Sequence, residues 1–222
     1  MSNVKFFLLG FLFFLGACDD GTRLSPIDIY NVEKDSDLKP IYADYYAVEN
    51  FVIDNNGKYL SVYVSGSVLV VSSEKDYLGQ ELPLEKFVIK SPSEHKVNDE
   101  HFPLELQFHH TDSLGKPIIA SVFVVEGEES PDLQLIIDNI PPKGSPQKIE
   151  TPIDLYYLFS MGQNYWTYEG SYTDKPYEAS VTWYIMQDPI EASAQQIEAI
   201  VNAIGKNKKE VVEIGDIKIR GF

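Results

Sequence analysis

Hydrophobic and polar residues alternate along several short segments of the chain. The clearest examples are residues 60–65, LSVYVS, and residues 104–109, LELQFH. Alternation with a period of two is typical of a β-strand that has one buried face. Clusters of Pro, Gly and Asn separate these segments, and Asn55-Asn56-Gly57 is a turn signal. Further β-rich runs are predicted at residues 118–125, 133–137 and 180–186.

One clear helix is predicted near the C-terminus. Ser193 and Gln196 form a capping box, and Gly205 is a typical residue for ending a helix. Between them the apolar residues have helical spacing: Ile197, Ile200, Val201 and Ile204. Because strand signals far outnumber helix signals, we expect a mainly β fold with minor α content.

The first residues have the pattern of an export signal. Lys5 precedes an apolar run at residues 6–15, which is too short for a typical membrane-spanning helix. The run ends in Leu15-Gly16-Ala17-Cys18, which resembles the bacterial lipobox, where the cysteine is the site of cleavage and diacylglycerol attachment. The alternative is a plain signal anchor. We expect three parts: a lipoprotein signal peptide at residues 1–17, a lipidated tether at 18–23 and a single domain at 24–222.

Cys18 is the only cysteine, so no intramolecular disulfide can form and lipid attachment is its expected role. Acyl chains there would hold the domain at a membrane face without spanning the membrane. Asp19 and Asp20 resemble an inner-membrane retention signal in enteric bacteria and a surface-export signal in other lineages. We therefore expect a protein of the bacterial cell envelope, at the periplasmic face or the cell surface.

The chain is strongly acidic, with a formal net charge of −16. Such a surface repels phosphates and sulfated glycans, so we expect no nucleic-acid partner. The acidic groups at Glu126, Glu128 and Glu129 are most simply explained as a solvated loop.

Residues 101–110, HFPLELQFHH, contain three of the chain's four histidines and raise the question of a metal site. Alternation places Glu105, Gln107 and His109 on one strand face and directs His110 to the other face. Adjacent strand residues cannot easily share one metal ion, so we expect His109 to be a polar residue in a cavity wall. The alternative is an improvised metal site at His109.

Several segments in order resemble the α-class carbonic anhydrases, from Leu24 to nearly the end of the chain. The most specific are YWTYEGSYTDKP, beginning at Tyr165, and VTWYIMQDPI, beginning at Val181. The resemblance implies a twisted, mostly antiparallel central sheet of about ten strands. It also implies a conical cavity whose floor, in that family, carries zinc held by three histidines with a fourth position open for water. The other matching segments are Ser25-Pro26-Ile27-Asp28-Ile29, Leu38-Lys39-Pro40, Asn55-Asn56-Gly57, Ser93-Glu94-His95 and Leu104-Glu105-Leu106.

The resemblance also implies that all three zinc ligands are replaced. In the family, two ligands alternate on one strand as Phe-His-Phe-His, and the third lies in Glu-Leu-His on the next strand. The matching positions here are Val88, Lys90 and Gln107. A valine has no donor atom, and a protonated lysine repels a divalent ion. We therefore expect no metal and no other cofactor.

Other cavity positions of the family are kept or altered. Thr173 matches the threonine that orients the zinc-bound hydroxide, and Glu94 matches its hydrogen-bond partner, so both are expected in a satisfied polar network. Lys58 stands at the position of the proton-shuttle histidine. The Lys90 ammonium is expected to take the place of the zinc charge beside acidic groups of the cavity floor: Glu94, Glu105 or Asp174.

These features favour a catalytically inactive domain that binds a ligand or scaffolds an envelope complex. Its partners would be the membrane, through the lipid on Cys18, and a protein of the envelope, with a small ligand in the cavity as a further option. The alternative is an enzyme: a carbonic anhydrase or weak esterase whose non-standard metal site combines His109 with His95 or His101.

Overall fold

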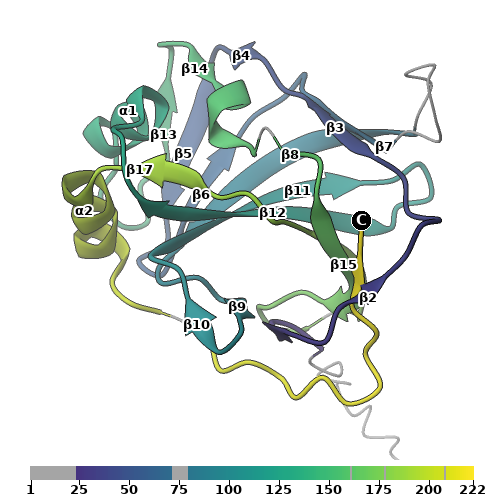
Figure 1. Ribbon diagram of the computed structural model, residues 1–222. Helices are drawn as coiled ribbons and strands as arrows, with labels where there is room; N and C mark the ends of the chain where they lie inside the picture. The colour runs from purple at the N-terminus through teal and green to yellow at the C-terminus, as the bar shows by residue number, and fades with distance from the viewer. Residues whose placement is uncertain (1–23, 72–79, 161, 178, 208) are drawn as a thin grey trace, which may run out of the picture.

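The computed structural model describes residues 24–71, 80–160, 162–177, 179–207 and 209–222. The expected signal peptide and lipidated tether lie outside these ranges. Most described strands belong to one large twisted sheet (Figure 1). Along its main path the strands are β13 (Gln147–Ile149), β5 (Phe51–Asn55), β6 (Leu60–Tyr63), β8 (Gln80–Lys90), β11 (Leu104–Thr111), β12 (Pro117–Glu126), β16 (Ala179–Met186), β15 (Tyr165–Ser171), β18 (Arg220–Gly221) and β2 (Glu33–Lys34).

Shorter strands extend or flank this sheet. β17 pairs with β12, and β7 joins β3 to β8. Separate small sheets contain β1, β9 and β10, and β4 with β14. The bounds of these strands are β1 (Asp28–Ile29), β3 (Ile41–Asp44), β4 (Ala47–Val48), β7 (Val68–Val71), β9 (Lys96–Val97), β10 (Glu100–His101), β14 (Ile153–Asp154) and β17 (Ile190–Ala192).

The expected fold class is confirmed. The main path of the sheet holds ten strands, and most neighbours are antiparallel. β12 pairs in parallel with β16 and with β17, and β18 pairs in parallel with β2, so the sheet is mixed. The turn signal is confirmed as well: Gly57 has φ +80° between β5 and β6, a conformation that glycine adopts readily.

The alternation predicted for β11 sorts its side chains onto two faces. Leu104, Leu106 and Phe108 belong to the larger hydrophobic core. Glu105 and Gln107 are buried on the opposite face of the same strand. That face also carries a second, smaller core, which includes Ile27, Ile119, Phe123, Tyr168 and Trp183. A hydrophobic core therefore covers each face of the sheet. The buried polar residues of β11 lie on the same face as the second core.

The predicted C-terminal helix is confirmed as α2 (Ala194–Ile204), with the capping box of Ser193 and Gln196 and with Gly205 at its end. The prediction of a β-run at residues 133–137 is wrong, because this segment lies in helix α1 (Pro131–Asp138). The Ser130 side chain accepts a hydrogen bond from the Leu133 backbone N–H, and Pro131 occupies the first turn. Both are helix-start signals that outweigh the β-branched composition of the run.

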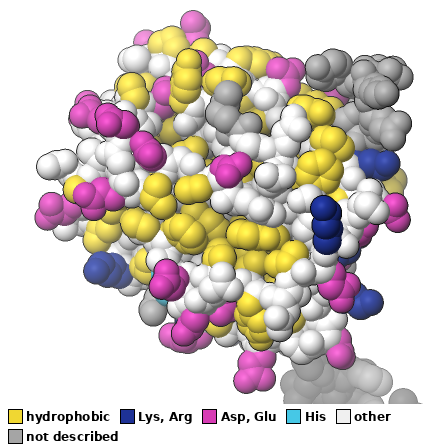
Figure 2. Space-filling model, viewed as in Figure 1, with side chains coloured by type: hydrophobic (Ala, Val, Ile, Leu, Met, Phe, Trp, Pro, Cys, Tyr) yellow, Lys and Arg dark blue, Asp and Glu magenta, His cyan; other side chains and the backbone are white. Residues whose placement is uncertain are grey.

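α1 and α2 lie side by side at one end of the sheet (Figure 1), and a short 3₁₀ helix, η1 (Leu155–Leu158), precedes β15. Within the described residues, neither α-helix is long or apolar enough to cross a membrane. Figure 2 shows one face of the molecule, where acidic side chains are scattered and basic ones are few, as the acidic composition predicts.

Gln196 joins the two helices, which gives a first prediction. Its side chain accepts a hydrogen bond from the Ser130 N–H at 3.0 Å and donates one to the Ser130 carbonyl at 2.7 Å. Gln196→Ala leaves the buried Ser130 N–H without its partner and removes one of the two hydrogen bonds to the Ser130 carbonyl, which keeps the Gln134 N–H at 2.9 Å. We expect a loss of about 2 kcal/mol in the free energy of unfolding, measured by urea denaturation, and a melting temperature lower by about 5 °C.

The matched control is Gln195→Ala, one residue earlier on the exposed face of the same helix. It changes helix propensity as Gln196→Ala does but removes no buried hydrogen bond. Equal stability of the two variants would contradict the linking role of Gln196.

Candidate functional site

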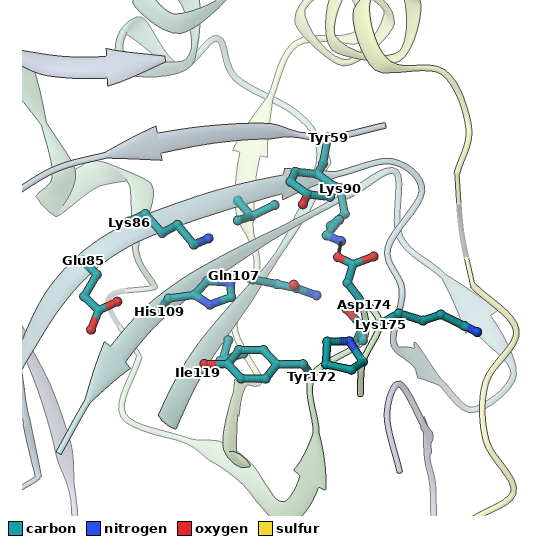
Figure 3. Close-up of a pocket in the computed structure, with 13 residues that line it drawn as sticks. Tyr59, Glu85, Lys86, Lys90, Gln107, His109, Ile119, Tyr172, Asp174 and Lys175 are labelled. Atoms are coloured by element: carbon teal, nitrogen blue, oxygen red, sulfur yellow. Dashed lines mark hydrogen bonds and ion pairs between the residues drawn. The ribbon is translucent and has the colours of Figure 1, made fainter. Parts of the chain in front are cut away.

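A cavity of about 290 Å³ opens where β8 and β11 face the loop after β15 (Figure 3). This is where the structure brings together most of the site residues predicted from the sequence. Those that line the cavity are Val88, Lys90, Gln107, His109, Thr173 and Asp174. Glu94 and Glu105 are buried and hydrogen-bonded to these residues. Lys58, by contrast, is exposed and lines a neighbouring hollow rather than this cavity.

The strand register fixes which side chains face each other across the cavity floor. Val88 on β8 pairs with Gln107 on β11. Two residues further along β8 in each direction, Lys90 pairs with Glu105, and Lys86 pairs with His109. Because side chains two residues apart on a strand point to the same face, the lysines 86 and 90 lie on either side of Val88 on the cavity face.

The Lys90 ammonium is buried and paired with two carboxylates. Its Nζ lies 3.2 Å from Glu94 Oε1 and 3.0 Å from Asp174 Oδ2. It also lies 4.3 Å from the centre of the Tyr59 ring, within the range of a cation–π contact. Burial works to lower the pKa of Lys90, but the charges of Glu94 and Asp174 outweigh it and raise the pKa, so the side chain is an ammonium at neutral pH. The expectation that Lys90 would lie beside acidic groups of the floor is confirmed for Glu94 and Asp174.

Glu105 is the centre of a buried hydrogen-bond network beneath the cavity. Its Oε1 accepts from His95 Nδ1 at 2.8 Å, Gln107 Nε2 at 3.0 Å and Ser121 Oγ at 2.7 Å. Its Oε2 accepts from the backbone N–H groups of Glu94 and His95. Burial alone would raise the pKa of Glu105, but the interaction with His95 and these hydrogen bonds lower it to about 2. Glu105 is therefore an ionised structural carboxylate.

Gln107 connects this network to the lysine cluster. Its amide nitrogen donates to Glu105 Oε1 and, at 3.2 Å, to Glu94 Oε2. Glu94 thus accepts from Gln107 with one oxygen and from Lys90 with the other. The network expected around Glu94 is present, but in the described part of the chain no hydrogen bond joins it to the Thr173 hydroxyl.

His95 is fully buried, and both of its ring nitrogens have hydrogen-bond partners. Its Nδ1 contacts Glu105, and its Nε2 is hydrogen-bonded to the Tyr168 hydroxyl at 2.7 Å. Tyr168 is hydrogen-bonded in turn to Ser25 at 2.8 Å. The imidazole ring also packs edge-on against Trp183. Both ring nitrogens of His95 are therefore occupied.

His109 and His110 point in opposite directions, as the alternation predicts. His109 faces the cavity and stacks with Tyr172, whereas His110 Nε2 is hydrogen-bonded to the buried Tyr45 hydroxyl at 2.6 Å. Burial, followed by the charges of Lys86 and Lys90, lowers the pKa of His109 to about 3. Burial lowers the pKa of His110 to about 4. Both imidazoles are neutral at neutral pH.

Two residues of the site were not predicted from the sequence. Lys209 forms an ion pair with Asp174 and lies 3.9 Å from Glu94. It lies in a segment without regular structure after α2. Hydrophobic periodicity therefore could not predict where its side chain points. Lys86 also lines the cavity, and here a signal existed, because it precedes Val88 by two residues on the same strand face.

The residues present do not fit zinc. Zinc in proteins is held by thiolate, imidazole and carboxylate ligands, and the floor positions are an aliphatic side chain, an ammonium and an amide. The two carboxylates beside Lys90, those of Glu94 and Asp174, already form ion pairs with its ammonium. Among the described residues, no group of three or more His, Cys, Asp or Glu side chains is arranged to hold a metal ion.

The large mixed sheet, with a polar cavity floored by β8 and β11, has the architecture of the α-carbonic anhydrases. An α-carbonic anhydrase from Thermovibrio ammonificans in complex with the inhibitor sulfanilamide matches with a TM-score of 0.81 and 30% identity, covering 91% of this chain and 88% of that one. A hyperthermostable carbonic anhydrase from a hydrothermal vent chimney matches with a TM-score of 0.82 and 28% identity, covering 92% of this chain and 90% of that one.

Sequence comparisons agree with the fold. The profile of the eukaryotic-type carbonic anhydrases matches residues 14–217. A carbonic anhydrase of Nostoc sp. is 30% identical over 205 residues, which cover 90% of this chain and 75% of the relative. One of Pectobacterium carotovorum is 28% identical over 185 residues, covering 81% of this chain and 71% of the relative. The chain therefore belongs to the eukaryotic-type carbonic anhydrase family, as the sequence resemblance predicted.

The lysine cluster gives a second prediction. Lys90→Met removes the ammonium and leaves the buried Glu94 carboxylate without its main counter-charge. Breaking a buried pair in this way costs about 3 kcal/mol or more. We expect a loss of this size in the free energy of unfolding, measured by guanidinium denaturation at neutral pH.

Lys116→Met is the matched control, because Lys116 pairs with Glu169 at 2.9 Å on the surface. Solvent screens such pairs, so this variant should unfold close to wild type. If Lys90→Met were as stable as Lys116→Met, the cavity floor would not depend on the ammonium.

Proposed function

We propose that this chain is a catalytically inactive member of the carbonic anhydrase family that acts as a binding or scaffold module in the bacterial cell envelope. The observation that carries the proposal is the cavity floor. At the positions that the sequence resemblance assigns to the three zinc ligands, the chain has Val88, a Lys90 ammonium paired with two carboxylates, and a Gln107 amide committed to Glu94 and Glu105.

The chemistry of the family explains why this replacement matters. It is well established for carbonic anhydrase that bound zinc lowers the pKa of water from about 15.7 to about 7 and so supplies hydroxide at neutral pH. In this cavity the charge at the floor is an ammonium, which neither coordinates water nor polarises it as a metal does. His109 is neutral and has no acidic partner beside it that would make it a strong base.

The alternative is an enzyme with a displaced metal held by His109 together with His95 or His101. No feature of the described residues favours it. Both nitrogens of His95 are hydrogen-bonded in the interior. His101 belongs to β10, and its Nδ1 lies 3.5 Å from the Ser93 hydroxyl. Metal analysis separates the two functions directly.

The envelope location is part of the proposal and depends on Cys18, which lies outside the described residues. A lipid on this cysteine would place the domain at a membrane face, in reach of a protein partner in the same envelope.

The third prediction concerns metal and activity. Protein purified without chelators should contain well under one equivalent of zinc by elemental analysis, and CO₂ hydration should proceed at the buffer rate even with zinc added. About one equivalent of tightly bound zinc together with hydration above the buffer rate would overturn the proposal.

A gain-of-function variant sharpens this test. The triple substitution Val88→His, Lys90→His and Gln107→His supplies three imidazoles at the matching positions. We expect this variant to bind about one zinc per chain and to melt at a higher temperature with zinc than with EDTA. The double variant without Gln107→His is the control, with one imidazole fewer and weaker binding expected.

The fourth prediction concerns the anchor. In cells fed an alkyne-labelled fatty acid, the wild-type chain should become labelled and Cys18→Ser should not, because the thiol is the attachment site. Thr22→Ser, four residues later, is the control and should keep the label. An unlabelled wild-type chain in a cell with active lipoprotein processing would refute lipidation.

A further inference from the structure

The outer half of the cavity holds polar groups that the floor network does not use. They are Lys86 and His109, which pair in register across β8 and β11. Figure 3 shows the Lys86 ammonium and the His109 ring directed into the same space, to the left of Lys90 and Asp174. Their position next to each other concentrates donor groups in a partly enclosed site.

His109 has an unsatisfied polar atom. Its Nε2 is buried and has no hydrogen-bond partner. Leaving a buried polar atom without a partner is costly, so such a group commonly marks a site that a ligand or a water completes. Since the imidazole is neutral, the tautomer with the proton on Nε2 would donate a hydrogen bond into the cavity.

Lys86 supplies the charge. Within the described residues its Nζ makes no ion pair. It lies 5.6 Å from the centre of the Tyr63 ring. Lys90 and Lys175 also line the cavity. An ammonium in a partly enclosed site attracts an anion more strongly than one on the open surface, because less water screens it.

The carboxylates that line the cavity do not cancel this charge. Asp174 is in ion pairs with Lys90 and Lys209. Glu85 accepts a hydrogen bond from the Thr111 hydroxyl at 2.6 Å, and Figure 3 shows its carboxylate directed away from the His109 ring. Among the described residues, neither carboxylate forms an ion pair with Lys86.

The rest of the cavity wall is apolar or aromatic. Val88 and Ile119 line the floor, and the Tyr172 ring stacks on His109 with centroids 6.1 Å apart and planes 11° apart. The cavity volume of about 290 Å³ lies just below the range of about 300–1,000 Å³ for ligand pockets, so only a small ligand fits. Such a site suits a small molecule with one anionic end and a flat apolar body.

We propose that this cavity binds a small organic carboxylate, with its oxygens at the Lys86 ammonium and His109 Nε2 and its apolar body against Val88, Ile119 and Tyr172. The inference rests on the proposed function, because it names a ligand class for a cavity that holds no metal. The carboxylate would satisfy the buried imidazole nitrogen, and its apolar part would cover the aliphatic floor.

Benzoate serves as the probe, and benzamide as a neutral analogue of nearly the same shape. The detergent-solubilised full-length protein, treated with EDTA, is titrated with each compound by calorimetry at neutral pH and constant ionic strength. We expect saturable one-to-one binding of benzoate and at least about tenfold weaker binding of benzamide, the difference expected for a hydrogen bond to a charged group.

Variants locate the site. Lys86→Met should weaken benzoate binding about tenfold, whereas Lys86→Arg, which keeps the charge, should retain most of it. His109→Phe keeps a ring beside Tyr172 but removes the donor, and should weaken binding several-fold. Lys148→Met, on the exposed edge strand β13, makes the same charge change away from the cavity and should bind as wild type. Circular dichroism checks that each variant is folded.

The outcomes separate this inference from the proposed function. Equal affinity for benzoate and benzamide, or wild-type affinity in folded Lys86→Met, would overturn the carboxylate site while leaving the inactive-enzyme proposal intact. Benzoate binding that requires added zinc and disappears with EDTA would overturn both. No benzoate binding by the wild-type protein would overturn the inference alone, provided that metal analysis again finds no zinc.

Discussion

The structure of the cavity depends on one buried ammonium. Burying the charge of Lys90 is costly unless carboxylates surround it, and Glu94 and Asp174 meet that need at 3.2 and 3.0 Å. Glu94 is itself buried, and Lys90 and Gln107 each donate a hydrogen bond to its carboxylate. Lys90 and Glu94 thus stabilise each other, and the ion pair of Lys90 with Asp174 joins β8 to the loop after β15.

From Lys90 the hydrogen bonds continue inward without a break. Gln107 bridges Glu94 and Glu105, Glu105 contacts His95, and His95 reaches Tyr168. This chain of contacts connects strand β11 to β15 and to the second hydrophobic core. Because nearly every polar group in it has a partner, the network stabilises one arrangement of the floor. Gln107 is essential to this arrangement, since a residue without amide donors would leave two carboxylates facing each other.

The sequence predicted the parts of this site that depend on strand periodicity. Alternation placed Glu105, Gln107 and His109 on one face of β11. The expectation that Lys90 lies near Glu94, Glu105 or Asp174 came instead from the family resemblance. Contacts from irregular segments were beyond such reasoning, as with Lys209, whose approach to Asp174 depends on the path of the chain after α2. The mistaken β-run at residues 133–137 arose because isoleucine content was weighted above the Ser130-Pro131 helix start.

The cavity therefore divides into two regions with different physical roles. In the inner region, Lys90, Glu94 and Gln107 satisfy one another, so changes there act mainly on stability. In the outer region, Lys86 and His109 leave donor groups unused, and the fold gains little from them. Residues that contribute little to stability and keep unsatisfied donors in a cavity are better explained by a ligand than by folding. Under the proposed function, the cavity floor is therefore a structural element, and ligand recognition falls to Lys86 and His109, which lie two residues further along the same two strands.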